Sequence, residues 1–259
     1  MKLFNKIYNL KNKSPKEIIL ISDIHYESKK DMKYLNKLYS KLEELKPEYI
    51  CIAGDLTNDA FIEDEDLLIE WLEKLSKLSK VIYSLGNHEC YISRKKKQFG
   101  FNINLLNRIS NIDNLYLLDN DNIIMDNINF IGITIPIKYY FEKKIDKQEL
   151  KDTFNKLKIK KGKYNILLCH SPIDICTEEY LKDSNIDLVL CGHMHGGVLP
   201  RFLRKIIKNG GIITPERKLF PKKCYGYIKI CDTEVIISSG IMVIRQLRNL
   251  FVSEIVKIK

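Results

Sequence analysis

Apolar runs and helical repeats alternate along the first third of the chain. Residues 18–21 form an apolar run without polar interruption, which is typical of a strand buried on both faces. Over residues 31–46 the apolar positions recur at helical spacing, and Pro47 marks the end of the predicted helix. A strand followed by a helix is the first half of a parallel crossover unit.

The same unit then repeats along the chain. Residues 49–53 predict a second strand, and regularly spaced leucines with one tryptophan predict a second helix ending near Leu78. The acidic residues 63–66 suit the positive end of that helix dipole. Residues 81–85 predict a third strand, so three successive strands are expected to form a parallel sheet.

The pattern changes in the second half of the chain. Residues 115–135 contain short apolar stretches with Asp-Asn turns, which predict two or three strands added in antiparallel fashion. The other predicted elements are a helix over 146–157, buried strands over 166–169 and 188–191, and a closing hairpin of 225–230 with 235–238. No internal repeat or linker interrupts this order, so we expect a single domain over residues 1–259.

The chain is strongly basic, with a formal net charge of +10 at pH 7 over 259 residues. A basic surface fits an anionic partner such as nucleic acid, phospholipid head groups or a phosphorylated substrate. An AT-rich coding sequence, which favours Lys, Ile and Asn, explains the same excess without any partner. The charge alone therefore selects no function.

The cysteines and the N-terminal residues indicate a compartment. The seven cysteines include no Cys-x-x-Cys pair, and Cys51, Cys169 and Cys191 lie in apolar strand-like runs, as buried thiols of a reducing compartment do. Residues 1–16 lack the continuous apolar core of a signal peptide, and no later apolar run is long enough to span a bilayer. We therefore expect a soluble cytoplasmic protein.

All five histidines lie in short motifs, most of which are acidic or glycine-rich and close a strand-like run. A lone histidine is usually packed or solvated, but imidazoles gathered with carboxylates suit divalent transition metals. The set is typical of a two-metal hydrolase. In order, the motifs are Asp23-Ile24-His25, Gly54-Asp55, Gly86-Asn87-His88-Glu89, Cys169-His170-Ser171-Pro172 and Gly192-His193-Met194-His195.

The positions of the motifs also favour one shared site. Strand ends in an open α/β sheet face one crevice, so residues that follow different strands can meet in space. Asp23 and His25 are one residue apart, which in an extended segment points both side chains to the same side. His193 and His195 repeat that spacing, so each pair can hold a metal ion.

The ordered set D-x-H, G-D, G-N-H-E, a lone His and G-H-x-H resembles the calcineurin-like metallophosphoesterases over residues 23–195. The resemblance implies an α/β fold, a mixed β-sheet sandwich flanked by helices in four layers (α/β/β/α). The G-H-M-H-G-G form, followed by a loop with Pro200 and Arg201, is also similar to the small bacterial phosphohydrolase branch of that family.

The resemblance further implies a role for each motif residue. Asp23, His25 and His195 would bind a first metal ion. Asn87, His170 and His193 would bind a second ion, and Asp55 would bridge the two. His88 would be the catalytic histidine that binds no metal. The implied cofactors are two divalent ions, with manganese favoured and iron, zinc or cobalt also compatible with these ligands.

The expected reaction follows from such a pair of ions. Two divalent cations about 4 Å apart can share a hydroxide, lower its pKa and direct it at phosphorus. His88 would protonate or stabilise the leaving oxygen. We therefore expect hydrolysis of a phosphomonoester, a phosphodiester or a pyrophosphate. Asp59, Glu89 and the carbonyls flanking Gly192 are candidate acceptors for the second nitrogen of the ligand histidines, with simple loop solvation as the alternative for both carboxylates.

Three other functions fit parts of the sequence. A binding or scaffold protein could keep the fold without turnover, but such relatives tend to lose ligand histidines and none is missing here. A DNA nuclease of the same family would use the basic surface, although 259 residues leave little room for a DNA-binding capping domain. An amidohydrolase also relies on His-x-His, but there the pair closes the first strand, whereas here it comes last.

Two basic segments follow the motifs, at residues 94–97 and 201–208. In the second, Phe202, Leu203, Ile206 and Ile207 alternate with basic residues, and core packing under a solvated basic face is the favoured interpretation. Peripheral contact with an anionic membrane is the alternative. Specificity is expected from residues 138–147 and 198–223, with a lipid-linked pyrophosphate, a nucleotide and a phosphoprotein all compatible.

Overall fold

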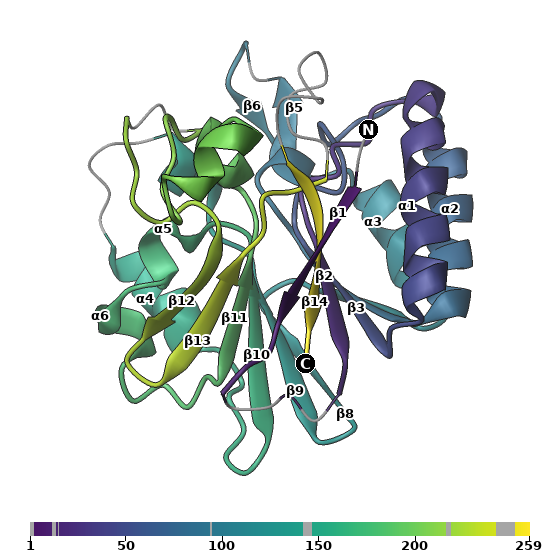
Figure 1. Ribbon diagram of the computed structural model, residues 1–259. Coiled ribbons are helices and arrows are strands. Elements are labelled where there is room, and N and C mark those ends of the chain that lie inside the picture. The colour runs from purple at the N-terminus through teal and green to yellow at the C-terminus, as the bar shows by residue number, and fades with distance from the viewer. Residues whose placement is uncertain are drawn as a thin grey trace.

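Two six-stranded sheets pack face to face, and helices cover the outer face of each sheet (Figure 1). The architecture is that of a computed structural model, which describes residues 3–11, 14, 16–93, 95–141, 147–215, 219–241 and 252–259. The four layers confirm the predicted α/β sandwich. In the described part of the chain, no helix combines the length and the apolar character needed to cross a membrane.

The first sheet contains the predicted parallel strands. Across the sheet, the strands are β1 (Leu3–Tyr8), β14 (Ser253–Ile258), β2 (Ile18–Ile21), β3 (Tyr49–Ala53), β4 (Lys80–Ser84) and β7 (Leu115–Leu118). The helices on its outer face are α1 (Met32–Leu45), α2 (Glu65–Leu78) and α3 (Ile103–Ser110). Strands β2, β3, β4 and β7 are parallel, and β14 runs antiparallel to β2.

The second sheet has a parallel centre and antiparallel edges. Across the sheet, the strands are β12 (Gly226–Ile230), β13 (Thr233–Ile237), β11 (Leu188–Cys191), β10 (Tyr164–Cys169), β9 (Ile128–Ile133) and β8 (Asn122–Met125). Its helices are α4 (Gln148–Asn155), α5 (Pro172–Ile175) and α6 (Glu178–Leu181). The closing hairpin predicted from the sequence is β12 with β13.

Short elements complete the fold. A separate hairpin is formed by β5 (Tyr91–Ser93) and β6 (Gln98–Phe99). The 3-10 helices are η1 (Lys29–Asp31), η2 (His88–Cys90), η3 (Ile137–Tyr140), η4 (His195–Val198) and η5 (Arg201–Lys205). Three predicted features fall partly outside the described residues. They are the basic run at Arg94, the start of the predicted helix and part of a specificity loop within 142–146, and part of the other specificity loop at 216–218.

Strands with apolar side chains on both faces explain the layering. Ile18 and Leu20 of β2 face the second sheet, whereas Ile19 and Ile21 pack under the helices. Side chains alternate between the two faces of a strand, so a fully apolar strand is buried only when both of its faces are covered. The continuous apolar runs in the sequence therefore required two outer helix layers around the paired sheets.

Two sequence predictions about the strands are wrong. Strand β7 pairs parallel with β4 and β9 pairs parallel with β10, so only β8 is the antiparallel addition expected over residues 115–135. The crossover to β7 is the eight-residue helix α3, which is shorter than the 14-residue helices of the two preceding crossovers. The expected crevice of one open sheet is instead one end of a sandwich, where β2, β3 and β4 face β10 and β11.

The expected packing of the basic segment 201–208 is also wrong. Phe202 and Ile206 are 70% and 78% exposed. The inward position of η5 is taken by Arg204, whose Nη1 donates a hydrogen bond to Ser239 Oγ at 2.9 Å and whose guanidinium lies 4.2 Å from the Tyr225 ring centroid. The half-buried Arg204 therefore anchors η5, and Phe202 and Ile206 face outward.

Candidate metal centre

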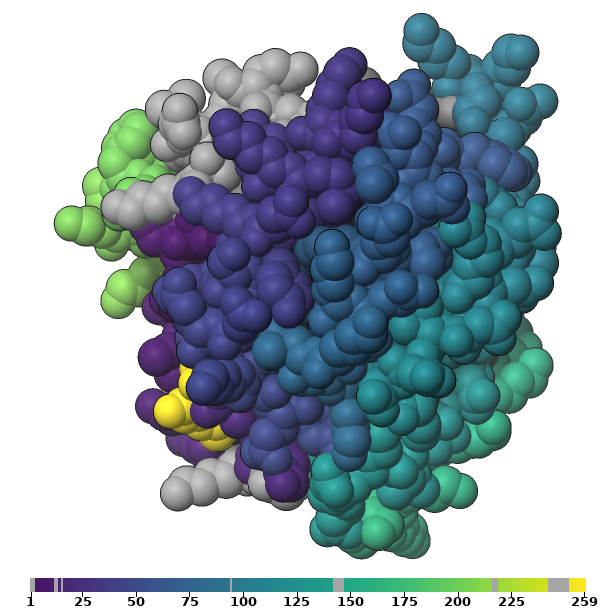
Figure 2. All heavy atoms as spheres, turned by 90° about the vertical axis from the view of Figure 1, so that its right-hand side faces the viewer, coloured from purple at the N-terminus to yellow at the C-terminus, as the bar shows by residue number. Residues whose placement is uncertain are grey.

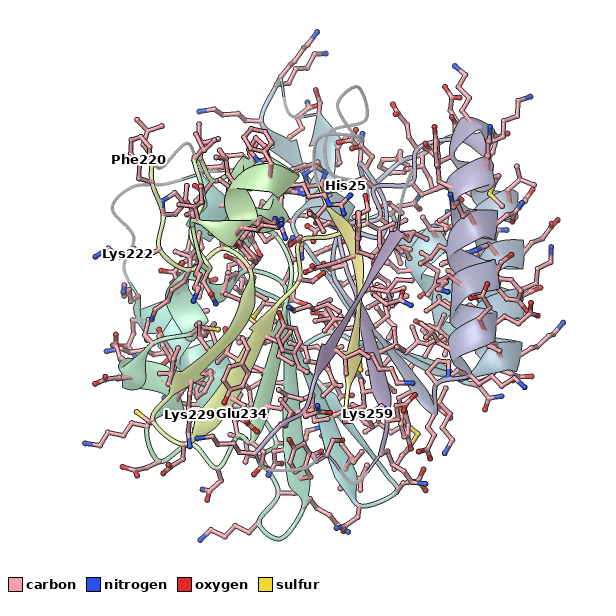
Figure 3. All side chains as sticks on the ribbon, viewed as in Figure 1. His25, Phe220, Lys222, Lys229, Glu234 and Lys259 are labelled. Carbon is pink, nitrogen blue, oxygen red and sulfur yellow. The ribbon has the colours of Figure 1, made fainter. Side chains whose placement is uncertain are left out.

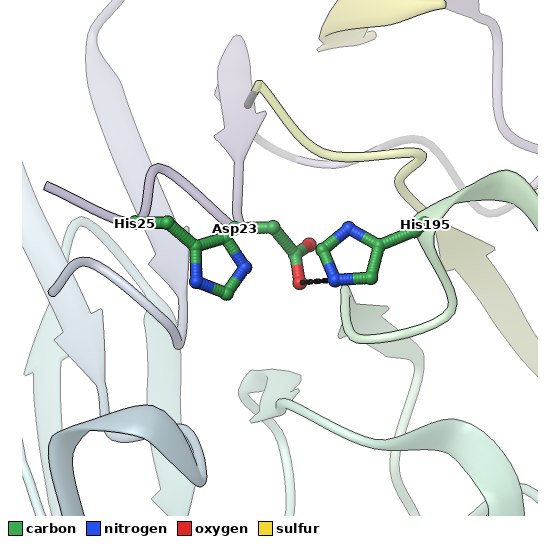
Figure 4. A group of neighbouring side chains, drawn as sticks. All are labelled: Asp23, His25 and His195. Atoms are coloured by element: carbon green, nitrogen blue, oxygen red, sulfur yellow. Dashed lines mark ion pairs between the residues drawn. The ribbon is translucent and has the colours of Figure 1, made fainter. Parts of the chain in front are cut away.

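The motif residues converge at the carboxyl ends of strands from both sheets. Two carboxylates and the five imidazoles form three overlapping groups whose ligand atoms lie within 4.8 Å of one another. Figure 4 shows the first group, in which Asp23 lies between His25 and His195. The groups are Asp23 with His25 and His195, then His25 with Asp55 and His88, and finally Asp55 with His170 and His193.

Asp55 is at the centre of the cluster. Its Oδ2 lies 3.0 Å from His170 Nε2, 3.7 Å from His25 Nε2 and 3.8 Å from His88 Nε2. Its Oδ1 accepts a hydrogen bond from the backbone N–H of His88 at 2.9 Å, which fixes the carboxylate orientation. One oxygen is therefore held by the backbone and the other faces three imidazoles.

The pattern of hydrogen bonds fits divalent cations. Among the described residues, buried atoms of the ligand type without a hydrogen-bond partner include Asp55 Oδ2, Asn87 Oδ1, His170 Nε2 and His195 Nδ1. Asp55 Oδ2 and His170 Nε2 lie 3.0 Å apart, so these two atoms can share a proton only when no cation is bound. A buried polar atom left without a partner costs about 1–3 kcal/mol. The lack of hydrogen-bond partners for such atoms at one cluster is explained if their lone pairs bind cations.

Neighbouring groups orient two of these ligands. His170 Nδ1 lies 2.8 Å from the carbonyl oxygen of Ala53, so Nδ1 carries the proton and Nε2 presents its lone pair to the cluster. Asn87 Nδ2 donates to the Tyr91 hydroxyl at 2.7 Å, so its Oδ1 is turned inward. Both side chains therefore present acceptor atoms to the space beside Asp55.

The electrostatics of the cluster also favour bound cations. Burial raises the pKa of the Asp55 carboxyl, but His170 and His88 lower it by more, and it lies well below its ordinary value. Burial lowers the pKa of His170, but Asp55 and Asp23 raise it by more, to about 10, so in the absence of a cation a proton on His170 supplies the positive charge beside Asp55. Burial and His88 lower the pKa of His25. Buried ionised carboxylates need positive charge beside them, which a divalent cation supplies.

Five of the motif residues have a left-handed backbone. Their φ angles lie in a region that costs a residue with a side chain about 1–3 kcal/mol and that clusters at functional sites. The one-residue spacing of the two motif pairs suggested extended segments, whereas both pairs have a left-handed backbone. The residues are Asp23 (φ 52°), His25 (φ 52°), Asp55 (φ 52°), His193 (φ 67°) and His195 (φ 46°).

Two motif glycines are required by close approach to the carboxylates. A Cβ atom on Gly86 would lie 2.3 Å from Asp55 Oδ1, and one on Gly192 would lie 2.6 Å from Asp23 Oδ2. Both distances are far below van der Waals contact, so any side chain there would displace a carboxylate. The glycines of G-N-H-E and G-H-M-H thus make room for the aspartates of the first two motifs.

Glu89 serves the backbone and not the ligand histidines. This buried carboxylate accepts hydrogen bonds from the N–H groups of Gly86 at 2.6 Å, Asp55 at 3.1 Å and Thr57 at 3.1 Å. Burial, with a smaller contribution from Asp55, raises the pKa of Glu89 to about 7. Glu89 therefore ties the G-D loop to the G-N-H-E loop, and the imidazole acceptors at His170 and His88 are backbone carbonyls instead, those of Ala53 and Asn58.

Two tyrosines at the cluster were missed in the sequence. The Tyr140 ring lies 5.0 Å from the His193 ring, and the Tyr91 ring lies 4.8 Å from the His88 ring. Tyr91 follows Asn87 by four residues, a spacing that could have suggested a partner for the amide. Tyr140 lies on η3, within the segment 138–147 where specificity was expected, but no local signal singled out this residue.

Known proteins and one family model match most of this chain. A family model described as calcineurin-like phosphoesterase matches residues 16–197. An uncharacterized metallophosphoesterase of Helicobacter pylori (strain J99) is 28% identical over 184 residues, which cover 70% of this chain and 45% of the relative. The chain thus spans less than half the length of that relative.

Two further proteins resemble the chain over most of its length. The UDP-2,3-diacylglucosamine pyrophosphatase LpxG of Chlamydia muridarum is 25% identical over 245 residues, covering 77% of this chain and 70% of the relative. The crystal structure of phosphopantetheinyl hydrolase from Mycobacterium tuberculosis has a TM-score of 0.53 at 13% identity, covering 90% of this chain and 91% of that one. At this identity the structural match supports the fold alone.

Proposed function

Because the chain belongs to the calcineurin-like phosphoesterase family, we propose that it hydrolyses a phosphate ester or pyrophosphate with the help of two divalent cations. The observation that carries the proposal is the set of buried lone pairs that face one cluster around Asp55 without hydrogen-bond partners among the described residues. Such atoms are costly unless they bind a cation. Manganese is our first choice of ion, because imidazole, carboxylate and amide ligands accept it.

The residues divide into two ligand groups. Asp23, His25 and His195 would hold one ion, and Asn87, His170 and His193 the other. Asp55 would bind both ions, since its Oδ2 faces imidazoles of both groups. When bound, the ions would supply charge that stabilises the phosphoryl oxygens and a water of lowered pKa.

His88 is suited to proton transfer. Its Nδ1 lies 2.7 Å from the carbonyl oxygen of Asn58, so the ring is held with Nε2 toward the cluster, 3.8 Å from Asp55 Oδ2. The side chain is 14% exposed and therefore remains accessible from outside. We propose that Nε2 delivers a proton to the leaving oxygen.

An apolar cavity of about 310 Å³, lined in part by residues that are close in sequence to candidate metal ligands, supports an amphiphilic substrate. Pro172 follows His170 by two residues, and Met194 lies between His193 and His195. A pocket of this size falls within the range that holds small ligands. The LpxG relative acts on a diacylated pyrophosphate, and we propose a lipid-linked phosphate or pyrophosphate here as well. Residues lining the cavity include Pro172, Ile173, Cys176, Met194, Lys222 and Lys223.

Hydrolysis assays test the proposal in two steps. Purified protein with manganese should hydrolyse bis(p-nitrophenyl) phosphate, p-nitrophenyl phosphate or both. A diacylated UDP-glucosamine should then be cleaved at least about tenfold faster than UDP-N-acetylglucosamine, since burying even two methylene groups of a chain contributes about 1.6 kcal/mol. If no phosphate compound is cleaved with any of several metals, the hydrolase proposal is wrong. If both sugar nucleotides are cleaved equally, only the lipid-linked substrate is wrong.

A further inference from the structure

Large apolar side chains are exposed on two segments that follow the G-H-M-H motif. The first is η5 with the residues just after it, and the second is residues 219–223. Phe202, Ile206 and Phe220 are 70%, 78% and 77% exposed. Single exposed apolar residues are ordinary, but large ones grouped together mark an interaction surface. Leu219, at 66% exposed, extends the group.

Hydrogen bonds join the two segments into one folded unit, which we call the docking loop (residues 201–225, described without 216–218). The N–H of Phe220 donates to the Ile212 carbonyl at 3.0 Å, and the N–H of Gly211 donates to the Pro221 carbonyl at 2.9 Å. The Tyr225 hydroxyl donates to the Ile207 carbonyl at 2.6 Å. The exposed apolar side chains are therefore carried by one connected structure.

The docking loop is basic as well as apolar. In the sequence of residues 198–225 the only acidic residue is Glu216. The exposed lysines among the described residues alternate with the exposed apolar residues, as in segments that lie at a membrane surface. They are Lys205, Lys208, Lys222 and Lys223. A second copy of this chain would bring the same positive charges face to face, which is unfavourable.

The docking loop lies at the same end of the molecule as the metal centre. Figure 3 shows Phe220 and His25 both at this end, with Lys222 on the outer side of the loop. The loop begins three residues after η4, whose first residue is the candidate ligand His195. Its anchor, Arg204, is hydrogen-bonded to Ser239. A surface that bound the loop would therefore lie near the opening of the cluster.

A second projection at this end has the same composition. Ile92 and Phe99 of the β5–β6 hairpin are 45% and 36% exposed, and the exposed residues Lys95, Lys96 and Lys97 lie between them. In Figure 2 the green atoms of the docking loop project at the upper left, and the blue atoms of the hairpin project at the upper right. Basic and apolar residues thus project from two places at this end of the molecule.

We propose that the docking loop seats the protein on an anionic lipid bilayer. Phe202, Ile206 and Phe220 enter the head-group region, and the lysines pair with lipid phosphates. The inference rests on the proposed function in one respect: a lipid-linked substrate would then be presented at the metal centre without leaving the membrane. The attraction to the bilayer is independent of turnover.

Vesicle sedimentation without substrate or added metal tests the docking. The full chain should bind phosphatidylcholine vesicles that contain phosphatidylglycerol and not those without it, and added salt should weaken the binding. In a variant with Phe202→Ser, Ile206→Ser and Phe220→Ser, each lost side chain should lower the partition coefficient about tenfold. Absence of binding to the anionic vesicles, or equal binding by this variant, would overturn the proposal.

Controls separate docking from folding and from self-association. Ile103→Ser with Ile124→Ser removes residues that are 59% and 43% exposed on α3 and β8, and vesicle binding should be unchanged. Lys205→Glu with Lys222→Glu should weaken binding about fivefold per lysine at low salt. In an alternative outcome, light scattering shows that the wild type is a dimer and the triple serine variant a monomer. If, in addition, neither the wild type nor this variant binds vesicles, the surface joins two copies and the proposal is wrong.

The test can fail independently of the proposed function. A variant with Asp55→Asn should sediment with anionic vesicles as the wild type does, because Asp55 is buried in the cluster and takes no part in docking. Vesicle binding with no hydrolysis of any substrate would support the docking surface and show that the proposed hydrolase function is wrong. Hydrolysis without vesicle binding would support the hydrolase function and show that the docking proposal is wrong.

Discussion

Replacing Asp55 with asparagine is expected to release bound metal and abolish turnover together. The carboxylate is buried at the centre of the cluster, and its Oδ2 faces imidazoles of both ligand groups. An amide of the same shape keeps the packing but removes one negative charge. Substituting a group that contacts a metal only through another residue lowers metal affinity by up to about 100-fold. Because Asp55 would bind the ions directly, we expect its substitution to lower metal affinity by more than that.

Metal analysis of the purified variant, with hydrolysis of bis(p-nitrophenyl) phosphate, measures both effects. The rate should fall at least about 10³-fold, the upper range for one lost electrostatic contact. Asp113→Asn is the matched control, because Asp113 is exposed and distant in sequence from every motif, and it should change neither quantity. Unchanged metal content in the Asp55 variant would remove the bridging assignment.

Replacing His88 with alanine is expected to slow turnover while metal content is retained. His88 is held by the carbonyl of Asn58, and its Nε2 points toward the cluster at a distance of 3.8 Å from Asp55 Oδ2. Loss of a proton donor to the leaving oxygen should lower kcat about 10²–10⁴-fold. The fall should appear in kcat, because the donor acts on the leaving group and not on substrate binding.

The leaving group provides the control for His88. p-Nitrophenolate departs readily as an anion and gains little from a proton, whereas an alkoxide leaving group needs one. The ratio of wild-type to variant rates should therefore be smaller for a p-nitrophenyl ester than for an alkyl ester. Equal losses for the two esters, or loss of metal from the variant, would contradict the role of His88 as a proton donor.

The sequence predicted the residues of the cluster better than the architecture that gathers them. Each motif is a short local signal, since Asp23 and His25, or His193 and His195, are neighbours that follow a recognisable strand. The apolar runs that predict buried strands do not state how many sheets bury them. From the pattern alone one open sheet was expected, and only the family resemblance implied the sandwich.

Elements with weak local patterns were missed. In β1, residues 5–7 are exposed between half-buried neighbours, as an edge strand allows, and the pattern resembles a loop. Its partner β14 is distant in sequence, so the pairing of Leu3 with Ser253 has no local signal. For the same reason the prediction of a specificity segment at 138–147 did not single out Tyr140, which meets His193 only through the fold.

The orientation of the basic segment could not be settled by periodicity either. Phe202 and Ile206 have the spacing of a buried helical face, and core packing was the favoured interpretation. The structure turns Arg204 inward and these residues outward, because Arg204 finds Ser239 and the Tyr225 ring as partners. Apolar spacing identifies a face of a helix but does not show what that face contacts.

A crystal structure after soaking with manganese tests the two-cation centre most directly. Anomalous scattering should show two peaks on either side of the Asp55 carboxylate, about 3.5–4 Å apart. One peak should lie against Asp23, His25 and His195, and the other against Asn87, His170 and His193. Absence of both peaks at saturating manganese, or a single ion bound away from Asp55, would contradict the account.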